Sequence, residues 1–342
     1  MKALAFTEFG GPEKLQLQEV PEPKVGAQDV LVRVRACALN HLDLWVRQGI
    51  PALKTPLPFW TGSDVAGDVV EVGSDVEGVK PGDRVAVNPN ISCRRCEFCV
   101  AGEDNLCPRY GLVGEHVPGG FAEYVAVRGD RVLTLPAEIG YEEAASFVLT
   151  NMTAWRMVVT QARVKPGEDV LVIGVGGGVS STAVQIAKLC GARVIVTSSS
   201  DEKLEKARAL GSDIGINYAK EDWARAVRTV TGGRGVDVVV ENVGAATWKQ
   251  SIRSLRRGGR LVTCGATTGP IGETDIRVRF WNQLHLIGST MSTTREFLDV
   301  MRLFFAGRLR PIVDEVVPLA EGAAAQQRLA EGRQFGKIVL RV

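Results

Sequence analysis

The sequence predicts an α/β fold class, with an irregular β domain followed by a doubly wound parallel sheet. Three observations support this prediction. Short β-like runs separated by Gly and Pro turns fill the first third of the chain, strand and helix patterns alternate after it, and a glycine-rich turn joins one of these strands to its helix. A chain of 342 residues is too long for one ordinary core and suits two domains.

The N-terminal part, residues 1–135, is expected to be the β domain. Turn signals such as Pro81-Gly82-Asp83 interrupt its β-like runs, which is typical of antiparallel strands. The runs are Val30–Ala36, Val65–Val72, Arg84–Asn88 and Phe121–Val127.

Residues 136–285 are expected to form the parallel sheet domain. Strand, helix and strand at this spacing indicate right-handed βαβ units. The expected strands are Asp169–Ile173, Arg193–Thr197, Val236–Glu241 and Arg260–Cys264, and the expected helices include Thr182–Leu189 and Asp201–Leu210. A final segment, residues 286–342, ends in the β-like run Lys337–Val342.

Composition excludes several kinds of partner. A formal net charge of +2 gives no general attraction to nucleic acids or anionic membranes. The chain contains no apolar stretch of ~20 residues that could span a bilayer, and Met1–Gly10 lacks the apolar run of a signal peptide. We therefore expect a cytoplasmic protein whose partners are neither nucleic acids nor membranes.

A dinucleotide site is predicted at the turn between the first parallel strand and its helix. Glycines there let the backbone approach a pyrophosphate, whose charge then lies at free helix N–H groups. A tight turn without a ligand is the alternative. The candidate residues are Gly174, Gly176, Gly177, Gly178 and Val179.

The next strand ends without an acidic residue at its tip, where NAD sites usually carry one. Ser198, Ser199 and Lys203 would instead suit a 2′-phosphate, so NADP(H) is predicted over NAD(H), which remains the alternative. A capping box between Ser199 and Glu202 would also explain one of these residues. Asn242, Gly265 and Ala266 follow later strands and are further cofactor candidates, unless they form only turns.

Four of the seven cysteines lie close together in the sequence. In a reducing cytosol this spacing indicates a metal site rather than disulfides. Four thiolates suit one structural Zn²⁺ per chain, closed to substrate; an iron–sulfur cluster or an empty, reduced cluster is the alternative. The ligands would be Cys93, Cys96, Cys99 and Cys107.

Together these features resemble the medium-chain dehydrogenase/reductase superfamily over essentially the whole chain. The resemblance implies a GroES-like catalytic domain, a Rossmann domain, a C-terminal return to the catalytic domain and a small-molecule substrate. It also implies a cofactor in the cleft between the domains. The matching motifs are Gly62-x-Asp64-x-Ala66-Gly67-x-Val69, Val79–Val85, the cysteine lobe, Gly174–Ser180 and Gly336–Leu340.

Zinc alcohol dehydrogenases of this superfamily hold a catalytic zinc that this sequence does not match. Asn40, Ser63 and Leu149 stand at the three ligand positions, and Leu42 replaces the hydroxyl that relays the substrate proton. A zinc that lowers the pKa of an alcohol needs such ligands. The sequence therefore predicts chemistry without a catalytic metal.

The segment Asn40–Asp43 instead resembles the quinone oxidoreductase branch, which reduces quinones or activated double bonds without metal. Members of that branch usually lack the cysteine lobe, so the chain is of mixed type. The resemblance implies Asn40, Asp43 and Thr153 as catalytic residues, with Asn40 donating a hydrogen bond to a developing oxyanion; a loop residue bonding its own backbone is the alternative. The family resemblance also implies cofactor contacts at Asn151, Gly288, Ser289 and Lys337 and, by analogy with alcohol dehydrogenases, at His41. A surface histidine and a strand-edge lysine are the alternatives for His41 and Lys337.

Two other functions are weighed. One is a zinc alcohol dehydrogenase with relocated ligands from Cys37, His41 and Asp64, although the first two lie in a region that reads as loop. The other is a non-catalytic NADPH-binding sensor. We also expect a homodimer or homotetramer, because the apolar run Phe280–Ile287 matches a family segment that pairs across a two-fold axis.

Overall fold

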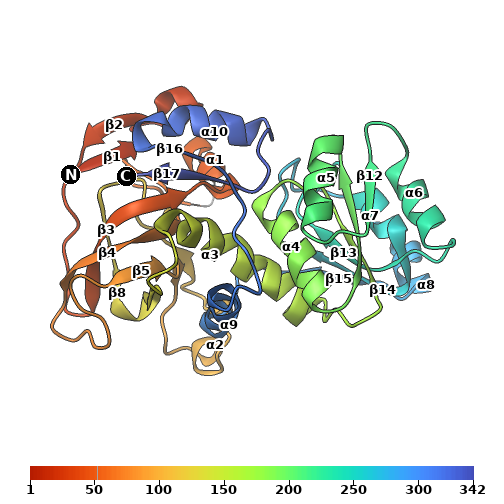
Figure 1. Ribbon diagram of the computed structural model, residues 1–342, viewed down its shortest axis with the longest axis horizontal. Helices are drawn as coiled ribbons and strands as arrows, with labels where there is room; N and C mark the ends of the chain where they lie inside the picture. The colour runs from red at the N-terminus through yellow and green to blue at the C-terminus, as the bar shows by residue number, and fades with distance from the viewer. Residues whose placement is uncertain (52) are drawn as a thin grey trace. The chain divides into compact units, whose positions relative to one another are not determined.

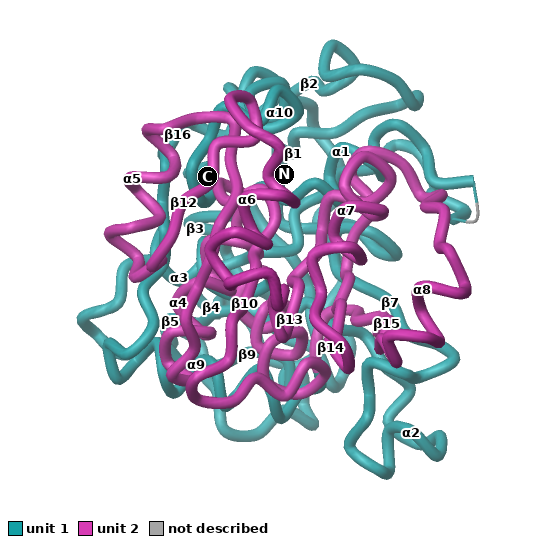
Figure 2. Tube along the Cα trace, turned by 90° about the vertical axis from the view of Figure 1, so that its right-hand side faces the viewer, with its two compact units in different colours: residues 1–149, 293–342 teal, residues 150–292 magenta. Residues whose placement is uncertain are grey.

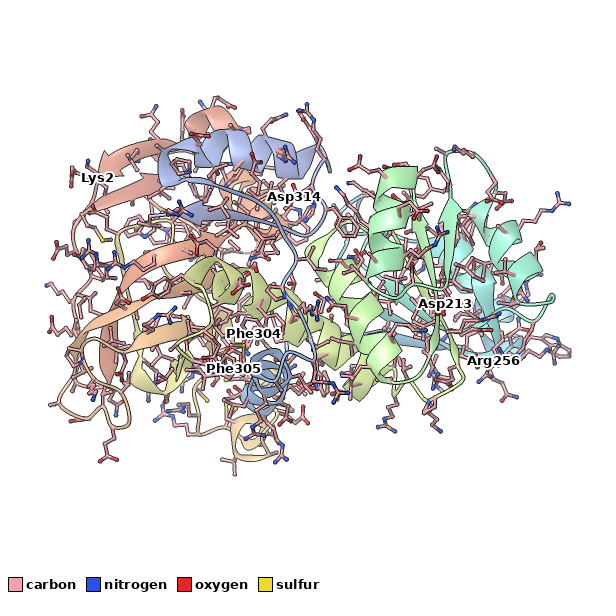
Figure 3. The ribbon with its side chains drawn as sticks, in the orientation of Figure 1. Lys2, Asp213, Arg256, Phe304, Phe305 and Asp314 are labelled. Atoms are coloured by element: carbon pink, nitrogen blue, oxygen red, sulfur yellow. The ribbon has the colours of Figure 1, made fainter. Side chains whose placement is uncertain are left out.

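The computed structural model describes residues 1–51 and 53–342, and its contacts divide these into two compact units (Figures 1 and 2). Unit 1 comprises residues 1–149 and 293–342, and unit 2 comprises residues 150–292. The sequence placed domain boundaries at 135 and 285 instead. The first turns of helix α3 (Tyr141–Trp155) belong to unit 1, where Phe147 stacks on Phe304 of α9 (Thr294–Phe305) with ring centroids 4.2 Å apart. Figure 3 labels Phe304 and its neighbour Phe305 at the end of α9.

Unit 1 is built on a seven-stranded, mostly antiparallel sheet in the order β16-β17-β3-β4-β5-β9, with β8 beside β3. Strand β3 shows why the sheet forms: Val30, Val32 and Val34 are buried on one face, and the residues between them turn outward. The strands are β3 Asp29–Ala38, β4 Asp64–Val72, β5 Arg84–Val87, β8 Tyr124–Arg128, β9 Val132–Thr134, β16 Val313–Pro318 and β17 Lys337–Arg341.

Smaller elements complete unit 1. Two short ribbons pair β1 (Lys2–Ala5) with β2 (Gln16–Glu19), and β6 (Asn90–Ile91) with β7 (Gly111–Leu112). The remaining helices are α1 His41–Gln48, α2 Glu97–Val100 and α10 Gly322–Ala330, with 3₁₀ turns at Pro12–Lys14, Asp104–Leu106, Gly129–Arg131 and Leu319–Glu321. The buried Arg47 connects α1 to α10, because its Nε donates to Gln326 Oε1 at 2.8 Å.

Unit 2 is a six-stranded parallel sheet in the order β12-β11-β10-β13-β14-β15. The strands are β10 Asp169–Val172, β11 Arg193–Ser198, β12 Ile214–Asn217, β13 Val236–Glu241, β14 Leu255–Thr263 and β15 His285–Gly288. The chain reverses direction across the sheet between β10 and β13. Ligands of doubly wound sheets bind at such a switch point, outside the carboxyl ends of the strands.

Helices connect these strands. Right-handed crossovers place α4 and α5 on one face of the sheet and α6 and α7 on the other, and α6 and α7 contact each other. The helices are α4 Gly178–Leu189, α5 Asp201–Ala209, α6 Trp223–Val230, α7 Trp248–Ser254 and α8 Ile276–Trp281, and a π-helical segment, Arg156–Gln161, follows α3. The predicted Rossmann-type α/β fold is confirmed.

One prediction about unit 1 is wrong. The region containing Cys37 and His41 reads as a loop in the sequence, but Cys37 lies in β3 and His41 is the first residue of α1. The helix begins there because Asn40 takes the extended N-cap conformation, with φ −132° and ψ 157°, and its backbone N–H donates to Asp43.

Over the described ranges, 1–51 and 53–342, no helix is long and apolar enough to cross a membrane.

Candidate functional site

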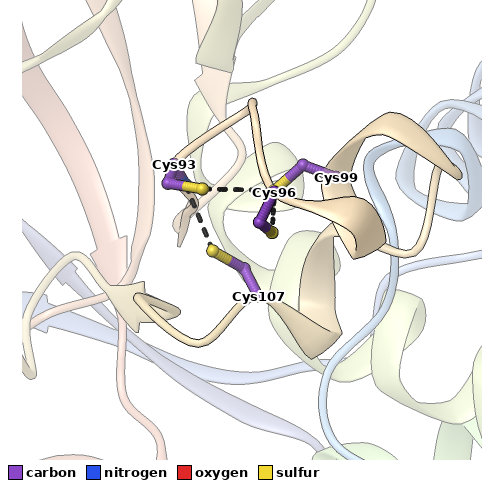
Figure 4. Close-up of side chains that lie close together, drawn as sticks. All are labelled: Cys93, Cys96, Cys99 and Cys107. Atoms are coloured by element: carbon purple, nitrogen blue, oxygen red, sulfur yellow. Dashed lines mark hydrogen bonds between the residues drawn. The ribbon is translucent and has the colours of Figure 1, made fainter.

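The four predicted cysteines converge in one lobe of unit 1 (Figure 4). Their sulfur atoms all lie within 4.8 Å of one another. The Sγ–Sγ distance is 3.5 Å between Cys96 and Cys99 and 4.0 Å between Cys93 and Cys99. Four sulfurs around one tetrahedral zinc, each with a Zn–S bond of about 2.3 Å, lie about 3.8 Å apart. The cluster is therefore capable of binding a structural zinc.

Hydrogen-bond donors also lie against the sulfurs of this lobe and favour the thiolate of Cys93, whereas, against a backbone hydrogen bond, burial and the neighbouring thiols raise the pKa of Cys96 to about 11. Cys107 Sγ accepts the N–H groups of Cys93 and Arg109, each at 3.3 Å. Hydrogen bonds, first from the backbone of Arg95 and then from Arg109, lower the pKa of the Cys93 thiol to about 5. Because metal ligation requires the thiolate form, these donors support the metal site.

The lobe is fastened to the start of α9. Asp104 accepts the backbone N–H of Thr294 at 2.9 Å and its hydroxyl at 2.6 Å. Arg131 donates to the same hydroxyl at 3.1 Å and to Ser92 at 2.7 Å. The lobe is thus part of the framework of unit 1.

Replacing Cys99 by Ser should lower both zinc content and thermal stability while leaving hydride transfer detectable in the folded fraction. The reason is that metal binding at such sites contributes about 10 kcal/mol or more to folding in zinc-finger peptides, and the lobe is linked to α9. Metal analysis and calorimetry measure the effect. The control, Cys190→Ser in unit 2, should keep both values, and a Cys99→Ser protein with unchanged zinc would contradict the assignment.

A second polar group of unit 1 gathers at the junction of β3 and α1. The carboxylate of Asp43 accepts the backbone N–H of Asn40 at 2.6 Å and that of Gly62 at 3.0 Å. These bonds join the start of α1 to the turn before β4, so Asp43 holds two chain segments together.

Asn40 itself lies in a closed triad. Lys337 Nζ donates to Asn40 Oδ1 at 2.5 Å and lies 2.9 Å from Asp64 Oδ2. Asn40 Nδ2 donates to the same Asp64 oxygen at 2.9 Å. The other Asp64 oxygen accepts the backbone N–H of Leu149 at 2.7 Å. The side chains of Lys337 and Asp64 are 4% and 0% exposed, so the ion pair is buried.

Burial also controls the neighbouring ionisable groups. It raises the pKa of the Asp43 carboxyl to about 6, although hydrogen bonds, first from the backbone of Asn40, act against the shift. It raises the pKa of the Cys37 thiol well above its usual value, with a further contribution from the charge of Asp43. For His41, burial and then the charge of Lys337 lower the pKa of the imidazole. Cys37 and His41 are therefore neutral near pH 7.

This group lacks the donor set of a metal site. The hydroxyl of Ser63 is buried with no hydrogen-bond partner in the described part of the chain, and Leu149 reaches the triad through its backbone alone. Within residues 1–51 and 53–342, the only group of three or more His, Cys, Asp or Glu side chains placed to hold a metal is the cysteine cluster. Cys37, His41 and Asp64, the relocated ligands of the alternative, do not form one.

The predicted pyrophosphate turn lies in unit 2, between β10 and α4. Gly174 and Gly176 have φ angles of +65° and +140°, which disfavour residues with a side chain. Gly177 is the N-cap of α4 and offers no side-chain cap, so the first N–H groups of the helix stay available for an anion. Ser180 takes the third small position, and its hydroxyl donates to Gly174 O at 3.0 Å.

The other predicted cofactor residues of the sheet follow strand ends on the same edge. The register pairs Glu241 of β13 with Thr263 of β14, and Thr263 with Gly288 of β15. The structure therefore brings together residues that lie at the ends of these strands or just after them. They are Asn242, Gly265, Ala266, Gly288 and Ser289.

The segment after β11 differs from one expectation. The N-cap of α5 is Ser200, whose hydroxyl accepts the N–H of Lys203 at 3.3 Å, so Ser199 does not cap the helix with Glu202. The nearest acid, Asp201, is bound to Lys220 and accepts from Asn217 Nδ2 at 2.6 Å. Ser198, Ser199 and Lys203 keep their predicted place beside the end of the strand.

Three site residues need separate mention. Asn151 and Thr153 lie in the part of α3 that belongs to unit 2, where the Thr153 hydroxyl lies 3.6 Å from Met291 Sδ. Their predicted roles stay predictions. Lys337 was expected to contact the cofactor, but its ammonium is bound to Asn40 and Asp64. Asp64 could not be predicted as the partner of Lys337, because no local pattern connects residues 273 positions apart.

Known proteins resemble the chain along its whole length. The family model described as alcohol dehydrogenase GroES-like domain matches residues 26–137, and the one described as zinc-binding dehydrogenase matches residues 178–306. An alcohol dehydrogenase of Geobacillus stearothermophilus is 35% identical, with 100% of each chain covered. A quinone oxidoreductase of Mus musculus is 31% identical, with 99% of this chain and 97% of that protein covered.

A solved structure agrees with this pattern. The crystal structure of an NAD-dependent alcohol dehydrogenase has a TM-score of 0.96 and 46% sequence identity, with 100% of each chain covered.

Proposed function

Because the chain belongs to the medium-chain dehydrogenase/reductase superfamily, we propose that it uses NADP(H) to reduce a quinone or an activated C=C or carbonyl substrate without a catalytic metal. The observation that carries this proposal is the Lys337–Asp64–Asn40 triad. Where zinc alcohol dehydrogenases of the family carry their ligands, this chain has Asn40, Ser63 and Leu149, and the Ser63 hydroxyl has no partner among the described residues.

Hydrogen bonding would take the place of the metal. When bound, the dinucleotide supplies a hydride to an electron-poor carbon, and negative charge develops on a conjugated oxygen. Asn40 would donate to that oxygen through the Nδ2 hydrogen that Asp64 does not accept, while Asp43 fixes the start of α1. Thr153 is a second candidate donor. A solvent proton would complete the reduction.

A zinc-dependent alcohol dehydrogenase is the second candidate, and the names of its relatives favour it. It would oxidise simple alcohols, whose pKa stays far above neutral without a metal. Among the described residues, no imidazole and thiolate near Asn40 are placed together to hold the metal that this chemistry uses.

The experiment that separates the two is a substrate panel. We expect the protein to oxidise NADPH with quinones, enones, enoyl thioesters or activated carbonyls, and to show at most trace oxidation of ethanol or benzyl alcohol. Brisk alcohol oxidation that a chelator abolishes would establish the second candidate. Binding of NADPH without turnover of any acceptor would favour the sensor.

The proposed preference for NADP(H) rests on Ser198, Ser199 and Lys203, and on Asp201 being engaged by Lys220. Replacing Ser198 by Asp should reverse the preference, because a carboxylate repels the 2′-phosphate and accepts from a ribose hydroxyl. Titration calorimetry with both cofactors measures it.

Two lysines of α5, Lys203 and Lys206, allow a controlled comparison of cofactor affinity. Lys203→Met should weaken NADPH binding, whereas Lys206→Met should not, because Lys206 pairs with Glu202 at 2.7 Å one turn further along α5. Equal affinity of the wild type for both cofactors would refute the preference.

We also propose that the protein is a homodimer or homotetramer. Strand β15 is the edge of the unit 2 sheet, and the side chains of Phe280 and Trp281 on the neighbouring α8 are 62% and 69% exposed. Pairing of two such edges would cover both features. Sedimentation should show at least a dimer at micromolar concentration, and Trp281→Glu should weaken the assembly. A monomeric wild type would contradict the proposal.

A further inference from the structure

The amide of Asn40 is held between opposite charges. Its oxygen faces the Lys337 ammonium at 2.5 Å and its nitrogen faces the Asp64 carboxylate at 2.9 Å. The reversed amide would place its N–H group beside an ammonium and its oxygen beside a carboxylate, and both contacts would be repulsive. The two charges therefore select one orientation of the amide.

This orientation leaves one amide hydrogen uncommitted. Asn40 Nδ2 carries two hydrogens, and Asp64 accepts one of them. Among the described residues, the other hydrogen has only a contact of 3.5 Å between Asn40 Nδ2 and Ala38 O, at the limit of a hydrogen bond. A substrate oxygen could accept this second hydrogen without displacing a strong bond.

The Lys337 ammonium also changes the net charge beside the position that a substrate oxygen would take. Asp64 alone would oppose a developing oxyanion next to Asn40, and the buried ion pair with Lys337 cancels that charge. The hydrogen bonds to Lys337 and Asp64 also polarise the Asn40 amide, and this polarisation makes its remaining N–H group a stronger donor. The other groups around Lys337 are the neutral Cys37 and His41 and the carboxyl of Asp43.

We propose that Lys337 is a positioning residue of the reaction: its ammonium, with Asp64 as counterion, fixes and polarises the Asn40 amide so that one N–H points to the substrate oxygen. This proposal rests on the proposed function, in which Asn40 donates the hydrogen bond to the substrate oxygen. Lys337 acts only through Asn40.

A double-mutant cycle tests whether Lys337 acts through Asn40. Lys337→Met alone leaves the buried Asp64 carboxylate without a counterion. The cycle therefore uses K337M/D64N, which removes both charges and preserves the fold. With any acceptor that the wild type reduces, K337M/D64N should lower kcat about ten- to a hundredfold and change KM little. Adding Asn40→Ala to it should cause no loss beyond that of Asn40→Ala alone.

If the Lys337–Asp64 pair contributed only to the stability of the fold, the kcat values of the cycle would show a different pattern. The losses would then multiply, or K337M/D64N would be as active as the wild type, and either result overturns the proposal. The control K14M/E8Q removes an exposed pair with Nζ and Oε1 2.6 Å apart, and should leave kcat unchanged.

A second readout does not depend on turnover. In protein with ¹⁵N-labelled asparagine, the Nδ2 hydrogens of Asn40, assigned by their loss in Asn40→Ala, should give two well-separated signals, one protected from exchange. K337M/D64N should shift both signals toward those of exposed asparagine side chains and remove the protection. Unchanged signals would overturn the Lys337 proposal even if the protein reduces one of the acceptors. If the signals change as expected but no acceptor is reduced, only the proposed function is rejected.

Discussion

Replacing Asn40 by Ala should reduce turnover of a quinone or enone by roughly ten- to a thousandfold, the range for removal of one preorganised donor to a developing oxyanion. The loss should fall mainly on kcat, because the hydrogen bond strengthens as charge develops on the substrate oxygen. Steady-state kinetics with the best acceptor of the panel measures it.

Ser63→Ala is the matched control. Ser63 also stands at a family zinc-ligand position, but its buried hydroxyl has no partner among the described residues, so its removal should cost little stability or activity. The metal-free account predicts a large effect at Asn40 and a small one at Ser63. Equal effects at the two positions, or an Asn40→Ala protein as active as the parent, would refute the role of Asn40.

Replacing Lys337 by Met should destabilise unit 1 by about 3–5 kcal/mol, because it leaves the Asp64 carboxylate buried without its counterion. The double variant K337M/D64N should recover most of this loss, since a neutral amide tolerates burial better. Calorimetry suits the measurement, because a protein of two units need not unfold in one transition.

An exposed pair gives the comparison. Lys14→Met removes the partner of Glu8, whose side chain is 67% exposed, and should leave the stability nearly unchanged because solvent screens an exposed pair. If Lys337→Met proved as mild as Lys14→Met, the ammonium would not be the counterion of a buried carboxylate, and the triad would lose its electrostatic basis.

Local patterns predicted most of the fold. The valine-rich segment Val236–Glu241 is strand β13 with the same bounds, because buried parallel strands are rich in β-branched apolar residues. The cysteine cluster was also predicted from the sequence, since the ligands of a zinc lobe come from one short segment. The glycines at the turn after β10 were predicted from the backbone geometry that a pyrophosphate site requires.

Features that depend on distant contacts could not be predicted in this way. Helix α1 has only eight residues, and its start depends on the capping by Asp43, so the segment looked like a loop. Lys337 and Asn40 are 297 positions apart, and only the pairing of β17 with β3 brings them together. No spacing rule connects them, so the contact between Lys337 and Asn40 could not be predicted, and the cofactor role of Lys337 stays a prediction.

The zinc content of the purified wild-type protein tests the central claim most directly. The account predicts about one zinc per chain, held by the cysteine lobe and lost in Cys99→Ser. It predicts no second metal beside Asn40, because the Lys337 ammonium supplies the positive charge there. Two zincs per chain, with the second retained in Cys99→Ser and lost in Asp64→Asn together with alcohol oxidation, would contradict it.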